Sequence, residues 1–122
     1  MNGAVTRVAI DLRGNRPLRP TEPRGRIPRV ARLLALAHHI DRKIADGEIR
    51  DWADAARRLR LTRARMTQIA NLLLLAAAIQ NEVLSMEPVV EGRDPVTERQ
   101  LRPIAAEADW TKQINAWREI HG

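Results

Sequence analysis

The chain of 122 residues contains no cysteine, no phenylalanine and no tyrosine, and three tryptophans are its only aromatic residues. The absence of cysteine excludes a disulfide framework and a thiolate zinc site. The three histidines include the neighbours His38 and His39 and show neither HExxH nor HxxxH spacing, so we expect no metal and no cofactor. A core of Leu, Ile, Val and Ala favours packed helices over sheets, and we expect an all-α fold.

Long apolar runs are also missing. No uncharged apolar stretch approaches the ~20 residues of a membrane span, and the N-terminus lacks the apolar segment of a signal peptide. There is no Walker A or other glycine-rich phosphate loop, and the carboxylates are scattered without a nucleophile or metal cluster beside them. We therefore expect a cytoplasmic protein that is not an enzyme and has no membrane partner.

The formal charge of +6 is spread unevenly along the chain. It is +4 over residues 1–26, +2 over 27–47, +3 over 48–75 and −3 over 76–122. A basic N-terminal two-thirds of this kind is typical of proteins that bind nucleic acids.

Composition divides the chain into three segments. Residues 1–26 are a basic arm in which the stretch RGNRPLRPTEPRGR holds five Arg, three Pro and two Gly. This arm has too little apolar area to offset its ordering entropy, so we expect it to be disordered when free. Residues 27–86 contain the predicted helix-turn-helix core, and residues 87–122 a C-terminal helical extension.

Helical periodicity and capping residues predict a small bundle of about five to six helices. The first begins at Pro28 and ends at Gly47. Asp51 caps a second helix over WADAARRL, which ends near Arg60, and Thr62 caps a third over RARMTQIANLLLL.

The later helices are shorter. A fourth is predicted over residues 78–86, and Thr97 with Gln100 forms a capping box for a fifth, which Pro103 should kink or shorten. The last segment, DWTKQINAWREI, places three apolar side chains on one face: Trp110, Ile114 and Trp117.

Five arginines occur within nine positions between two apolar runs. A helix, a tight turn and a second helix are the outline of a helix-turn-helix. Ala56 lies where such helices would cross, Leu59 points the same way, and Leu61 fills the turn. Arg60 stands where glycine is usual. The inward stripe of the second helix is Met66, Ile69, Ala70 and Leu73.

The outward side chains of this pair suit DNA. Arg can pair with guanine and Gln with adenine, while Thr and Ala can contact the thymine methyl group. We assign base reading to Thr62, Arg63, Ala64, Arg65, Thr67 and Gln68. The arginines at the edge of the groove, Arg57, Arg58 and Arg60, would meet phosphates.

The same pattern also fits an amphipathic helical pair with a basic face that never reads DNA. In that interpretation the protein is an adaptor for another protein, for example a site-specific recombinase, and has only nonspecific DNA affinity.

The stretch ADAARRLRLTRARMTQIANLLLLAAAIQNEVL resembles the helix-turn-helix core of the ParB/KorB family of DNA-binding proteins. The likeness covers about residues 28–107 and is most specific over 59–84. The matching parts are the Ala-rich helix, the LT before the second helix, TQIANLLLL and IQNEVL, and VTERQLRPIAA resembles the next helical segment.

The resemblance implies sequence-specific binding of double-stranded DNA and association with the nucleoid. The protein would be a small transcriptional regulator, or a partition or recombination accessory protein of a mobile element or phage. The resemblance also places Asn71 near the DNA backbone. It does not include the family's N-terminal nucleotide-binding domain, so we do not expect CTP-dependent clamping.

The arm carries a second DNA-related pattern. PRGRIP, residues 23–28, nearly repeats the core of an AT-hook, whose Arg-Gly-Arg lies in the A·T minor groove. This suggests that Arg24 and Arg26 insert into a minor groove beside the main site. The alternative is a solubilising tail that touches phosphates nonspecifically.

At the other end, Trp110 and Trp117 would fasten the last helix to the core of the protein, or else form a stripe with Ile114 for a protein partner. A second copy is one such partner, since repressors often dimerise to read paired half-sites.

Overall fold

The computed structural model describes residues 25–121, which form six α-helices, one 3₁₀ helix and no strand. This confirms the expected all-α fold. The elements are α1 (Arg29–Ala45), α2 (Trp52–Leu59), α3 (Arg63–Ala70), the 3₁₀ helix η1 (Asn71–Leu74), α4 (Ala77–Leu84), α5 (Glu98–Ala105) and α6 (Trp110–Ile120). None of the helices in this part of the chain is long and apolar enough to cross a membrane.

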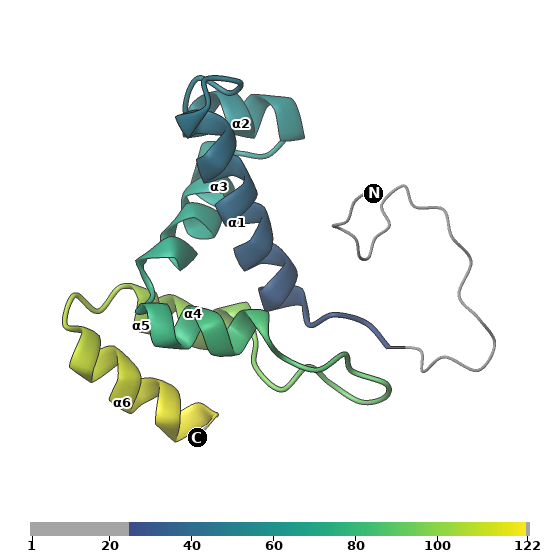
Figure 1. Cartoon of the computed structure of the whole chain (residues 1–122), viewed down its shortest axis with the longest axis vertical. Helices are drawn as coiled ribbons and strands as arrows, with labels where there is room; N and C mark the ends of the chain where they lie inside the picture. The colour runs from purple at the N-terminus through teal and green to yellow at the C-terminus, as the bar shows by residue number, and fades with distance from the viewer. Residues whose placement is uncertain (1–24, 122) are drawn as a thin grey trace.

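The longest helix, α1, connects two groups of helices (Figure 1). Its C-terminal end packs with α2 and α3 around a small core of Ile40, Ala55, Ala56 and Met66. Its N-terminal end joins η1, α4, α5 and α6 around a larger core that includes Leu34, Leu72, Ile79 and Leu101. The predicted recognition helix α3 therefore packs on a small apolar core, below α2 in Figure 1 and above the helices of the larger core.

Two predicted inward residues are placed differently. Leu59 is 45% exposed, because it is the last residue of an eight-residue helix that ends before the side chain can reach the core. The third helix was predicted to continue through NLLLL, but it changes to 3₁₀ geometry at Asn71. The tighter winding turns Leu72 into the core and leaves Leu73 only half-buried.

The backbone between η1 and α4 lacks helical hydrogen-bond partners, and two glutamine side chains supply them. Gln80 Nε2 donates to the carbonyl oxygens of Leu73 and Leu75 at 3.1 and 2.8 Å. Gln113 Oε1 accepts from Ala76 N at 2.7 Å. An unpaired buried backbone group is costly, so these bonds stabilise the junction.

Gln113 also ties this junction to the C-terminal helices. Its Nε2 donates to Leu74 O at 3.1 Å and to Glu107 O at 2.8 Å, and the residue is 1% exposed. Every hydrogen-bonding atom of the buried amide therefore has a partner, and α6 is fixed against the end of η1.

Local signals explain the C-terminal helices. Thr97 and Gln100 form the predicted capping box at the start of α5, and the helix ends two residues after Pro103. Asp109 caps α6 by accepting from Thr111 N and Lys112 N.

Replacing Gln113 with Leu should lower the free energy of unfolding by roughly 2–4 kcal/mol, because three backbone groups lose their only side-chain partner. Urea denaturation measures this. Asn115→Ala, an exposed change on the same helix, should stay within about 0.5 kcal/mol of wild type. An equally small effect for Gln113→Leu would contradict the assigned role.

Candidate nucleic-acid interface

The turn between α2 and α3 is built from backbone and capping interactions. Arg60 is in the left-handed region with φ 59°, and it is the one non-glycine residue with positive φ in the described chain. Leu61 N donates to Ala56 O at 2.9 Å and Arg60 N to Arg57 O at 3.2 Å, as in a Schellman motif. Thr62 then caps α3 by accepting from Arg65 N at 3.0 Å. The predicted helix, turn and helix are all present.

Helix α2 has a side-chain cap of the same kind as the Thr62 cap of α3. Asp51 accepts from Asp54 N at 2.8 Å at the start of α2.

A small hollow of about 210 Å³ lies between the start of α2 and helix α3. It is lined by Trp52, Ala53, Arg63, Met66 and Thr67. Arg63 and Thr67 are exposed, so this hollow adjoins the exposed side of α3.

Most of the predicted base-reading residues share one exposed surface. Four are exposed at the start and along the outer side of α3: Thr62, Arg63, Ala64 and Thr67. Asn71, at the start of η1, is exposed in line with Ala64 and Thr67, and Gln68 is half-buried beside them. We call this set, Thr62, Arg63, Ala64, Thr67, Gln68 and Asn71, the α3 face.

Arg65 is held differently from its neighbours. Its guanidinium forms a two-bond ion pair with Glu98 of α5, one bond measuring 3.0 Å, and its Nη1 also donates to Gln68 Oε1 at 2.9 Å. The side chains of Arg65 and Glu98 are only 24% and 9% exposed. Base contact by Arg65, which the sequence predicted, would require this ion pair to open.

The ion pair perturbs both partners. Hydrogen bonds from Arg65 lower the pKa of Glu98, against the opposing effect of burial, and the charges of Arg65 and Arg102 add to the decrease. The hydrogen bonds that Arg65 donates to Glu98 raise the pKa of Arg65, against the opposing effect of burial. Both groups are therefore charged over the whole physiological range.

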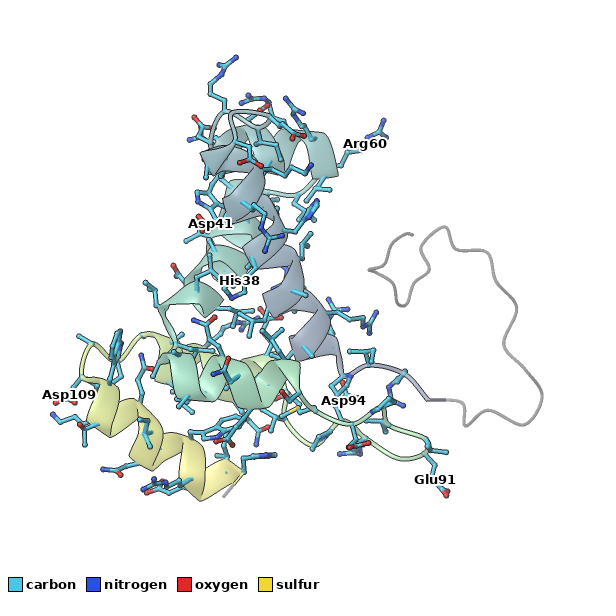
Figure 2. The ribbon with its side chains drawn as sticks, viewed as in Figure 1. His38, Asp41, Arg60, Glu91, Asp94 and Asp109 are labelled. Atoms are coloured by element: carbon cyan, nitrogen blue, oxygen red, sulfur yellow. The ribbon has the colours of Figure 1, made fainter. Side chains whose placement is uncertain are left out.

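The predicted phosphate-binding arginines of α2 remain accessible. Arg57 and Arg58 both pair with Asp54, at 3.1 and 3.2 Å, yet their side chains are 61% and 57% exposed. Surface pairs of this kind contribute little and open readily. Arg60 extends outward from the end of α2 (Figure 2).

Arg26 is attached to the domain. It forms a two-bond β-bridge with Val89, and its Nη2 donates to Gly92 O and Asp94 Oδ1 at 2.9 and 2.8 Å. Asp94, labelled in Figure 2, also accepts from Arg29 N. A minor-groove role for Arg26 would require this ion pair to open. Arg24 lies outside the described residues.

The predicted apolar stripe of the last helix is divided. Trp117 is buried and donates from Nε1 to Glu82 Oε1 at 2.9 Å, and Ile114 packs half-buried at the edge of the larger core. Trp110, by contrast, is 63% exposed and lines a groove of about 860 Å³ between α1 and α4. Only Trp110 remains available to a partner without rearrangement.

Sequence reasoning missed Glu98, which reaches α3 from 33 residues further along the chain. The described residues contain no cluster of three or more histidine or carboxylate side chains that could hold a metal ion. Comparison with protein-family models, curated proteins and solved structures finds no match. The resemblance to ParB/KorB proteins therefore stays a prediction from the quoted residues.

The Arg65–Glu98 pair should make stability depend on pH. Because the pKa of Glu98 is lowered on folding, its contribution is complete above the ordinary value of 4.5 and is lost as the pH falls through the lower folded value. Wild type should be more stable than Glu98→Gln at pH 7, and the difference should shrink below pH 4.5. Urea denaturation from pH 7 to 3 tests this, and a difference that does not change with pH would contradict it.

Proposed function

We propose that the protein binds double-stranded DNA sequence-specifically, with α3 in the major groove. The observation that carries the proposal is the α3 face: short or flexible polar side chains exposed at the N-terminal part of a helix whose other side is anchored in a core. That part of the second helix contacts base edges in helix-turn-helix proteins.

The small side chains on the α3 face and the positive charge of the arginines of residues 57–60 support the proposal. Ala64 and Thr67 are small, so the helix can approach the base edges closely. Arg57, Arg58 and Arg60 are exposed beside them and can meet the phosphates that border the groove. Residues 48–75 carry +3 and residues 76–122 carry −3, which favours docking through the α2–α3 end of the molecule.

In this proposal the protein acts as a small transcriptional regulator, or as a partition or recombination accessory protein, associated with the nucleoid. A ParB/KorB-like role without the nucleotide-binding domain is one form of it. Binding as a homodimer would appear as a palindromic site, and a recombinase or other DNA-processing protein is a compatible partner.

The second candidate function is that of a protein-interaction adaptor. The exposed Trp110 beside the groove between α1 and α4 favours it, because exposed tryptophan is frequent in protein interfaces. An adaptor would keep only weak, salt-sensitive affinity for DNA.

Arg63→Ala separates the two functions. If Arg63 reads a base, its loss should reduce discrimination at one position of the site by about 1–3 kcal/mol, while the free energy of unfolding stays nearly unchanged because the side chain is exposed. Selection of sites from a random DNA pool at about 150 mM salt, followed by affinity for mutated sites, measures the change. An unchanged preference at every position would favour the adaptor.

Arg57→Ala should act differently. It should weaken binding to all sequences by a similar factor and reduce the slope of log affinity against log salt concentration by about one. Arg118→Ala makes the same change in charge on the exposed side of α6 and should leave the slope unaltered. Equal effects of the two variants would mean that the DNA does not dock at α2.

A further inference from the structure

The side-chain amide of Gln68 has one end occupied. Its Oε1 lies 2.9 Å from Arg65 Nη1. A guanidinium has only donors, so the amide atom that faces it must be the oxygen. Within residues 25–121, Gln68 Nε2 has no hydrogen-bond acceptor, so both of its N–H groups are free for a ligand, whereas one of the two lone pairs of Oε1 is already engaged.

The orientation of this amide depends on a residue outside α2 and α3. Arg65 donates to both carboxylate oxygens of Glu98. Glu98 Oε2 also accepts from Arg102 Nη2, one turn further along α5, at 3.3 Å. The carboxylate is 9% exposed, so the pair is partly shielded from water and salt. Glu98 thereby fixes Arg65, and Arg65 fixes the oxygen end of Gln68.

We propose that the Arg65–Glu98 pair makes Gln68 read bases mainly as a donor, through Nε2, and thereby favours guanine. This inference rests on the proposed DNA-binding function and names its specificity at one position. The two hydrogens on Nε2 can be shared between the N7 and O6 acceptors of guanine. The paired contact of glutamine with adenine needs Oε1 to accept from N6, and the bond from Arg65 already engages one of the two lone pairs of that oxygen and so weakens it as an acceptor for N6. This inference differs from the pairing of Gln with adenine that residue type alone suggests.

The test is selection from a random DNA pool with the full chain, followed by affinity measurements. Gln68→Ala first locates the position that Gln68 reads, as the one whose discrimination falls. At that position wild type should prefer guanine to adenine by about tenfold or more.

A charge swap then tests the mechanism. In Arg65→Glu with Glu98→Arg, the carboxylate introduced at position 65 can accept from Gln68 Nε2 and turn Oε1 toward the DNA. The preference should move to a base that donates, adenine through N6 or cytosine through N4. A preference for guanine that survives the swap would overturn the proposal.

Glu98→Gln gives a second route if the swapped chain does not fold. It removes the charge that holds Arg65, so the amide of Gln68 can turn and the preference for guanine over adenine should fall about tenfold. Glu119→Gln, an exposed change on α6, is the control and should leave the preference as in wild type. Unchanged discrimination in Glu98→Gln would overturn the proposal.

The outcomes separate this inference from the proposed function. If wild type selects no site at all, the proposed function fails and this inference fails with it. If wild type selects a site but Gln68→Ala relaxes no position, or adenine is preferred there, only the inference fails.

Discussion

The side-chain amides of Gln80, which is half-buried, and Gln113, which is buried, hydrogen-bond the backbone where the helix is interrupted between η1 and α4. Between η1 and α4, Gln80 and Gln113 bond three carbonyl groups and one N–H group of residues 73–76. The start of α4 has no side-chain cap, and these amides bond the backbone directly before it. Because η1 continues α3 directly, the same bonds set the position of α3 relative to α4 and α6.

Helix α5, which belongs to the larger core, also influences the side chains exposed on α3. The core shared by α1, α2 and α3 is small, and α5 adds a polar connection to it through Glu98 and Arg65. That connection holds Arg65 against α5 and orients the Gln68 amide, while Arg63 is exposed. The residues that would meet DNA and the residues that arrange them therefore come from different helices.

Local features of the chain were predictable, and long-range ones were not. Asp51, Thr62 and the Thr97–Gln100 box act within three residues, so their caps follow from sequence pattern. The change to 3₁₀ geometry at Asn71 depends on tertiary packing and shifted the inward residue from Leu73 to Leu72. The contacts of Glu98 with Arg65 and of Gln113 with Leu74 and Ala76 join residues 33 to 39 positions apart, and no local pattern encodes them. Candidate reading residues could thus be named from type and spacing, but not which of them are already engaged.

Docking of DNA on the α3 face can be tested by titrating ¹⁵N-labelled protein with a mixed-sequence duplex. The backbone amide chemical shifts then report which residues the DNA contacts. Phosphate contacts occur on any sequence, so no selected site is needed. If DNA docks on the α3 face, the largest shifts should fall on residues 57–71, with α6 little changed. Shifts concentrated around Trp110 and the groove between α1 and α4, or no shifts at low salt, would contradict it.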